Sequence, residues 1–170
     1  MDVETAIRTR RTHKVYGGEP VDDATLRELL ELATYAPNHH LTNPWRFRVL
    51  GPAARERLRA AADAQQAGSG AKLDRAPTLI AVTVRTDGED PDEDRDATAV
   101  ATYLVLLGAH ARGLAGYWRT PGVLKTEQGR AALGIPPEED TVALVHLGPP
   151  RQDQYTPNRA PLDEVAVFLD

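Results

Sequence analysis

Cysteine is absent from this chain of 170 residues. Its absence excludes disulfide bonds, thiolate metal sites and cysteine nucleophiles, and it is consistent with a reducing compartment. No run of apolar residues approaches the roughly 20 that a membrane-spanning helix needs. The charged N-terminus also lacks the apolar segment of a signal peptide. The sequence therefore predicts a cytoplasmic protein with no membrane partner.

Basic residues are fewer than acidic ones, and the formal net charge is −5. Most of the acidic excess lies in residues 87–96, where seven acids accompany a single arginine. The remainder is nearly neutral, which argues against nucleic acid as a partner, because such a surface needs many cations on one face. Since residues 87–96 lack the Asp-x-Asp-x-Asp-Gly spacing of a calcium loop, they predict a solvated loop and no metal site.

One short segment has the opposite charge: residues 8–14 read Arg-Thr-Arg-Arg-Thr-His-Lys. Four cations, two hydroxyls and an imidazole stand where a short amphipathic helix should end. Guanidinium groups bind phosphate through paired N–H donors, so the segment indicates a phosphate or nucleotide site. Cations also favour the negative end of a helix, but that effect accounts for only one or two of the four charges.

Hydrophobic periodicity divides the chain into helices and strands without an internal repeat or a long linker. We expect one domain over residues 1–170, with an α+β fold in which helices flank a mixed sheet. Residues 97–112 are apolar around nearly the whole helix, which predicts a helix inside the molecule. Residues 163–169 alternate like a strand without a hairpin partner, so they either fold back or join another subunit's sheet. Helices are expected at residues 2–9, 22–36, 52–67, 97–112 and 127–133, and strands at 45–50, 78–84, 114–118, 141–147 and 163–169.

Four stretches, in order along the chain, resemble the motifs of one known family. They are Arg10-Arg-Thr-His-Lys14, Ala36-Pro-Asn-His-His-Leu-Thr-Asn-Pro-Trp-Arg-Phe47, Ala111-Arg-Gly-Leu-Ala-Gly-Tyr-Trp-Arg-Thr120 and Asn158-Arg-Ala-Pro-Leu-Asp-Glu-Val165. Together they cover nearly the whole chain in the order that the family shows. On these motifs the sequence is similar to the FMN-dependent nitroreductase family, and close to its short, minimal subgroup.

The resemblance implies a nitroreductase-like fold and an intertwined homodimer with C-terminal segment exchange and two FMN sites at its interface. NADH or NADPH would reduce the flavin, which would pass electrons by a ping-pong mechanism to nitroaromatic, quinone or similar acceptors. The flavin carries the chemistry, so no catalytic side chain and no metal are expected. The cofactor-binding residues that the resemblance implies are Arg10, Arg11, Thr12, Lys14, His39, Asn43, Trp118, Arg119, Thr120 and Arg159.

Among these residues, Arg10 and Arg159 would bind the phosphate, and His39 would face the flavin of the neighbouring subunit. Two positions depart from the family pattern. Asn43 replaces the usual glutamine, and Tyr35 stands where close relatives have arginine. Some family members act as dehydrogenases, dehalogenases or flavin-cleaving enzymes, and a flavin-binding relative of that kind with little nitroreductase turnover is the alternative. A nucleic-acid or interaction module that uses the cationic segment is a third hypothesis.

The remaining histidines and aromatic residues favour structural roles. His110 and His146 lie in apolar elements, which predicts satisfied core or interface histidines. Trp45 and Phe47 alternate along an expected strand, which predicts sheet core.

Overall fold

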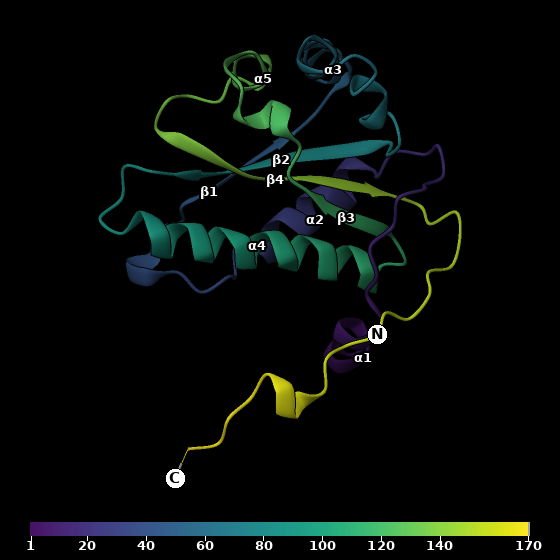
Figure 1. Cartoon of the computed structure of the whole chain (residues 1–170), viewed down its shortest axis with the longest axis vertical. Coiled ribbons are helices and arrows are strands. Elements are labelled where there is room, and N and C mark those ends of the chain that lie inside the picture. The colour runs from purple at the N-terminus through teal and green to yellow at the C-terminus, as the bar shows by residue number, and fades with distance from the viewer. Residues whose placement is uncertain (170) are drawn as a thin grey trace.

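The computed structural model describes residues 1–169. A sheet of four strands lies at its centre in the order β1-β2-β4-β3, with each strand antiparallel to its neighbours (Figure 1). We expected a sheet with both parallel and antiparallel strands. The only parallel pairing among the described residues is one isolated bridge, between Thr12 and Gly116. The strands are β1 (Trp45–Val49), β2 (Thr78–Arg85), β3 (Ala115–Arg119) and β4 (Glu139–Gly148).

Helices cover both faces of this sheet, which confirms the α+β fold. One face packs against α2 and α4, and the other against α3 and α5 (Figure 1). Among residues 1–169, no helix combines the length and apolar character that crossing a bilayer requires. The helices are α1 (Val3–Thr9), α2 (Asp23–Ala33), α3 (Pro52–Gln65), α4 (Pro91–Ala111) and α5 (Glu127–Leu133), with short 3₁₀ turns η1 (His39–Leu41), η2 (Gly70–Lys72), η3 (Gly122–Lys125) and η4 (Leu162–Glu164).

The central strand β2 explains the continuous apolar run in the sequence. Leu79 and Ala81 belong to the core under α3 and α5, whereas Ile80 and Val82 belong to the core under α2 and α4. All four side chains are buried. Because side chains alternate between the two faces of a strand and both faces are covered, neither set can be polar.

Helix α4 begins earlier than expected and contains residues 91–96, more than half of the acidic stretch. The carboxylate of Asp90 caps it by accepting a hydrogen bond from the backbone N of Glu93 (3.0 Å), and Pro91 occupies the first turn. The expectation of a solvated loop is therefore wrong for residues 91–96. Proline is favoured at the first helical position, and acids stabilise the positive end of a helix.

The outer face of α4 is not covered by the chain itself. Val100 is 40% exposed, and Tyr103 and Leu107 are only partly buried. The expectation of an internal helix is thus wrong for this face of the single chain. A helix that is apolar on every side needs a second surface to bury the side opposite its own sheet.

The C-terminal segment does not form the expected strand within this chain. The chain passes α1 before it reaches η4, and residues 165–169 then extend farther away from the sheet (Figure 1). Val167 and Phe168 are 82% and 88% exposed. An isolated extended segment has no hydrogen-bond partners for its backbone, so alternation alone cannot make it a strand.

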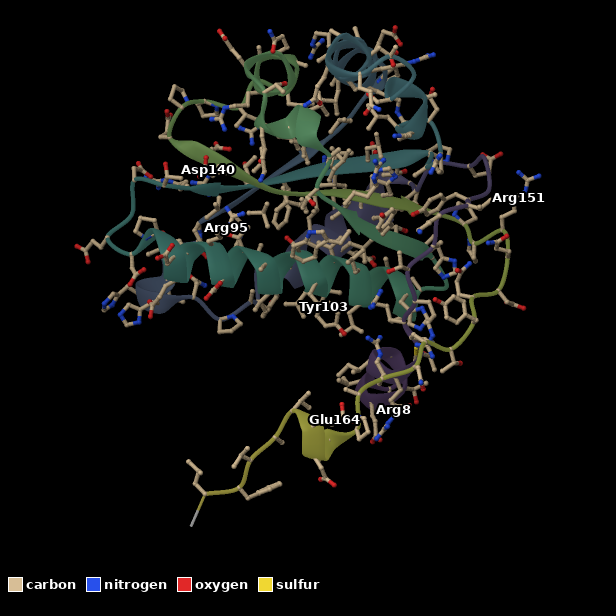
Figure 2. The ribbon with its side chains drawn as sticks, in the orientation of Figure 1. Arg8, Arg95, Tyr103, Asp140, Arg151 and Glu164 are labelled. Atoms are coloured by element: carbon tan, nitrogen blue, oxygen red, sulfur yellow. The ribbon has the colours of Figure 1, made fainter. Side chains whose placement is uncertain are left out.

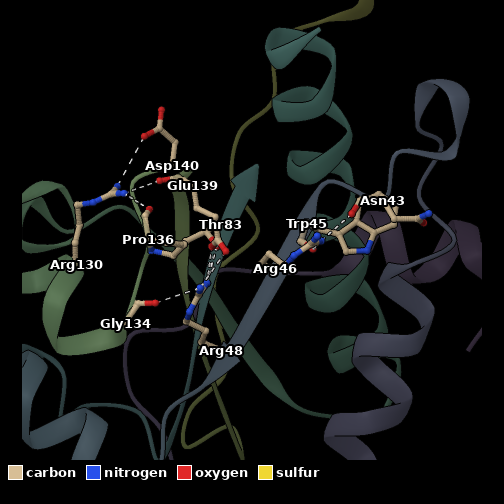
Figure 3. A network of polar contacts seen from close by, with 10 residues as sticks. All are labelled: Asn43, Trp45, Arg46, Arg48, Thr83, Arg130, Gly134, Pro136, Glu139 and Asp140. Atoms are coloured by element: carbon tan, nitrogen blue, oxygen red, sulfur yellow. Dashed lines mark hydrogen bonds and ion pairs between the residues drawn. The ribbon is translucent and has the colours of Figure 1, made fainter. Parts of the chain in front are cut away.

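A polar network joins three strands at one end of the sheet (Figure 3). Arg48 on β1 donates to Glu139 on β4 through both terminal nitrogens (2.7 and 3.1 Å), and Thr83 on β2 also donates to that carboxylate. Arg130 of α5 donates to the backbone oxygens of Pro136 and Glu139 (2.6 and 2.7 Å). The nearly buried carboxylate of Glu139 thereby accepts hydrogen bonds from side chains on β1 and β2.

Candidate functional site

The cationic segment lies along the free edge of β3. Thr12 forms the parallel bridge with Gly116, and the backbone N of His13 donates to the Gly116 oxygen (3.1 Å). These contacts make residues 10–14 an extended addition to the sheet edge. These backbone contacts fix the segment at the sheet edge, and its side chains lie beside the residues that follow β4.

A cavity of about 270 Å³ opens between this segment and the C-terminal region. The sequence predicted four of its lining residues as cofactor contacts: Arg10, Arg11 and Thr12 near the N-terminus, and Arg159 near the C-terminus. The full lining is Arg10, Arg11, Thr12, Gln154, Tyr155, Pro157 and Arg159. Folding thus brings the two predicted phosphate-binding arginines to the same small space.

Neither Arg10 nor Arg159 forms an ion pair with an acidic side chain of residues 1–169. The Nε atom of Arg10 is buried and has no hydrogen-bond partner. Its guanidinium carbon lies 5.9 Å from the ring centroid of Tyr103, which projects from the face of α4 turned away from the sheet (Figure 2). A partly buried cation with an unsatisfied donor is costly, so the cavity favours an anion between the two arginines.

Arg11 has a structural task in addition to lining the cavity. Its Nη1 donates to the backbone oxygens of Arg8 and Arg10 (2.7 and 2.9 Å). These oxygens lie at the C-terminal end of α1, where helix carbonyls lack intrahelical partners. The side chain therefore caps α1 and adds its positive charge to the cavity wall.

Four further predicted residues lie farther along the same edge. Because the bridge at Thr12 is parallel, Lys14 and Trp118 follow it in the same direction along the sheet. Lys14 and Thr120 are exposed, and Trp118 is partly buried against the core under α2 and α4. Arg119 points to the other face, where its Nη1 donates to the backbone oxygen of Lys72 (3.4 Å).

His39 and Asn43 are not part of the Arg10 cavity. They belong to the loop around η1, beside the N-terminal end of α4, whereas the cationic segment lies at the C-terminal end of that helix (Figure 1). His39 lines a separate cavity of about 670 Å³, and its Nδ1 is 4.0 Å from Glu93 Oε2. In the part of the chain that the structure describes, no group of three acids or histidines could hold a metal ion.

The η1 loop has an unusual backbone. His40, Leu41 and Asn43 have φ angles of 50°, 52° and 47°, in the left-handed region that non-glycine residues rarely adopt. The side-chain amide of Asn43 donates to the Leu41 oxygen (2.6 Å), so its N–H group is engaged within the loop. Backbone strain of this kind concentrates at functional sites.

Sequence reasoning missed four residues around the Arg10 cavity. Gln154, Tyr155 and Pro157 come from an irregular segment with no periodicity, and Tyr103 was considered only as part of the apolar helix expected at residues 97–112. The available signal was the position of Tyr155, an aromatic residue in a proline-containing segment just before Arg159.

The family model described as "Nitroreductase family" matches residues 7–149. The chain belongs to the nitroreductase family. It is 29% identical over 204 residues to a Thermus thermophilus protein named NADH dehydrogenase, covering 99% of this chain and 96% of that protein. Identity to 5,6-dimethylbenzimidazole synthase of Rhodospirillum rubrum is also 29%, over 181 residues, covering 91% and 85%. A Desulfovibrio desulfuricans protein solved in complex with FMN is 27% identical, with a TM-score of 0.84 and coverage of 99% and 96%.

Proposed function

We propose that this nitroreductase-family chain is an FMN-dependent NAD(P)H oxidoreductase. NADH or NADPH delivers reducing equivalents, which pass to nitroaromatic, quinone or similar acceptors in alternating half-reactions. The observation that carries the proposal is the convergence of Arg10 and Arg159 on one cavity without an acidic partner. A phosphate dianion satisfies both groups, and the FMN-bound relative supports the choice of that cofactor.

The side chains present fit a flavin mononucleotide. Arg10 and Arg159 would hold the phosphate, and the Thr12 hydroxyl would donate to it or to the ribityl chain. Bound flavin supplies the hydride chemistry, so the protein contributes position and charge. Lys14 adds a cation farther along the edge, whereas the Arg119 side chain points to the other face. A cation about 4 Å from a negative charge contributes roughly 4 kcal/mol at an effective dielectric of about 20, which would favour reduction.

We also propose that the working unit is a homodimer. The Arg10 cavity and the His39 loop lie at opposite ends of α4, whose 21 residues span about 32 Å at 1.5 Å per residue. Two copies of α4 packed antiparallel about a twofold axis would bring the His39 loop of one copy toward the Arg10 cavity of the other. The same packing would cover Val100, and exchange of residues 163–169 would bury the exposed tail.

The visible spectrum of the purified protein tests the cofactor. We expect the visible absorption of an oxidised flavin, about one released FMN per chain, and anaerobic bleaching by NADH or NADPH. Colourless protein that does not take up added FMN would reject the proposal. Flavin that neither nucleotide bleaches would reject the reductase activity alone.

Matched arginine variants test the site. Arg159→Ala should weaken FMN retention by about tenfold to a hundredfold, because a hydrogen bond to a charged group contributes roughly 1.5–3 kcal/mol. The control is Arg151→Ala, since Arg151 is exposed on the loop after β4 and points away from the sheet (Figure 2). Equal FMN dissociation constants for the two variants would contradict the placement of the phosphate.

A flavin-dependent role other than reduction of nitro compounds is the alternative. It is favoured by the relative named 5,6-dimethylbenzimidazole synthase, which matches most of the chain. Steady-state assays with a nitrofuran and a quinone separate the two. Near-zero turnover of both acceptors by protein whose flavin is readily reduced would favour the alternative.

A further inference from the structure

The end of α1 places Arg10 against the outer face of α4. Arg10 is the C-cap of α1, and its backbone N donates to the Ala6 oxygen (3.0 Å). The preceding residue, Thr9, is tied to α4, because its hydroxyl oxygen lies 2.8 Å from His110 Nε2. The spacing from Tyr103 to His110 is close to two helical turns of about 3.6 residues, so both side chains project from the same side of α4. The side chain of Arg10 therefore meets Tyr103.

An aromatic ring holds the guanidinium of Arg10. Its carbon Cζ lies 5.9 Å from the ring centroid of Tyr103, within the roughly 6 Å at which an aromatic face attracts a cation. The Nε atom of Arg10 is buried and has no hydrogen-bond partner. Arg11, in contrast, donates to the backbone oxygens of Arg8 and Arg10. The two adjacent arginines are thus held by different means, Arg11 by hydrogen bonds and Arg10 by the ring.

This arrangement keeps the N–H donors of Arg10 available to an anion. A guanidinium stacks through its flat face, whereas its hydrogen bonds leave from its edge. Tyr103 does not line the Arg10 cavity, so its ring orders the cation without taking the place of a ligand. An arginine loses considerable side-chain entropy when it is fixed, and a side chain that is ordered before binding no longer imposes that cost on the ligand.

We propose that Tyr103 is a positioning residue, which holds Arg10 ready for the phosphate of the cofactor. The inference rests on the proposed flavin function and deepens it, because it assigns part of the phosphate affinity to a residue outside the cavity. Tyr103 acts through Arg10. Since it projects from the face of α4 turned away from the sheet, it also places the phosphate site beside the proposed dimer surface (Figure 2).

The affinity for FMN relative to riboflavin tests this role, because riboflavin is the same molecule without the phosphate. Both dissociation constants are measured by flavin fluorescence on the full-length protein after dialysis to remove bound flavin. Tyr103→Leu should raise the dissociation constant of FMN about threefold to thirtyfold and that of riboflavin less than about twofold. Tyr103→Phe, which keeps the ring and removes the hydroxyl, should change both constants less than about twofold.

A double-mutant cycle shows whether Tyr103 acts through Arg10. In an Arg10→Ala background, Tyr103→Leu should change the ratio of the FMN and riboflavin affinities less than about twofold, because the cation that it positions is absent. Val100→Ala is the matched control, since Val100 lies on the same outer face of α4 and is 40% exposed. This control should leave both dissociation constants within about twofold of wild type.

The outcomes separate a positioning role from a structural one. If Tyr103→Leu weakens FMN and riboflavin equally, or leaves both unchanged, the proposal is overturned. An equal fall of the affinity ratio in the presence and absence of the Arg10 side chain overturns it as well. Wild-type protein that binds FMN no more tightly than riboflavin would instead contradict the phosphate site itself, and with it the proposed cofactor.

Discussion

The buried histidine of β4 should make the stability of this protein depend on pH. His146 is 1% exposed, lies opposite Leu79 of β2, and its ring centroid is 5.9 Å from that of Tyr117. Its Nε2 is buried and has no hydrogen-bond partner. Burial, assisted by the positive charges of neighbouring arginines, lowers its pKa to about 3. The sequence correctly predicted a core histidine, but this nitrogen is not satisfied.

The sign and size of the effect follow from proton linkage. In the unfolded chain, His146 is protonated below the ordinary histidine pKa of about 6.5. In the folded chain it stays neutral until the pH falls to about 3. The free energy of unfolding should therefore fall as the pH drops below 6.5, by about 1.4 kcal/mol per pH unit from this group. Between pH 7 and pH 5 the loss is about 2 kcal/mol, a large part of the roughly 5–15 kcal/mol typical of domains.

Urea unfolding followed by circular dichroism at pH 7, 6 and 5 measures this loss. The leucine of His146→Leu cannot titrate, and the variant lacks the unsatisfied nitrogen. The free energy of unfolding of the variant minus that of the wild type should therefore increase by about 2 kcal/mol when the pH is lowered from 7 to 5. Other titrating groups occur in both proteins and cancel in the difference. Leu79→Val is the control, because it should cost about 1 kcal/mol equally at every pH. A wild-type-to-variant difference that stays constant from pH 7 to pH 5 would refute the reasoning.

Three further predictions concern other parts of the molecule. Arg48→Met should lower the free energy of unfolding by about 2–4 kcal/mol in urea titrations, because it strands the nearly buried carboxylate of Glu139, and Glu139→Gln made in addition should recover part of that loss. His39→Ala should change the flavin spectrum or acceptor KM while leaving the melting temperature within a few degrees; a collapsed melting temperature with unchanged activity per folded molecule would make His39 structural. Deletion of residues 163–170 should weaken the proposed dimer, and an unchanged sedimentation coefficient at micromolar concentration would argue against segment exchange.

Much of the local structure could be predicted because it depends on short-range patterns. The apolar run at residues 78–84 forms β2, and the helix expected at residues 22–36 is α2, which buries Leu26, Leu29 and Ala33. The wrong predictions arose where one local sequence pattern is compatible with two different structures. Acids after Pro91 suit either a loop or a helix start, and alternation at residues 163–169 produces a strand only if another strand lies beside it.

The candidate site shows the same division. Residue types and order identified Arg10, Thr12 and Arg159 through a family resemblance, and their cavity is present in the structure. No local pattern could reveal that Tyr103 lies beneath Arg10 or that Tyr155 completes the cavity wall, because those contacts depend on how α4 and an irregular segment pack. The distance between the His39 loop and the Arg10 cavity was equally invisible in the sequence, because it depends on the length and direction of α4.

The sequence alone determined the class of fold, most element boundaries and the chemistry of the cationic segment, since periodicity and functional-group type are properties of neighbouring residues. Tertiary structure decided which cations remain without an acidic partner and which cavity adjoins them. It also decided which histidine is buried without a hydrogen bond. These outcomes depend on contacts between residues far apart in the chain, and on burial, which sets the energetic cost of leaving a polar group unsatisfied.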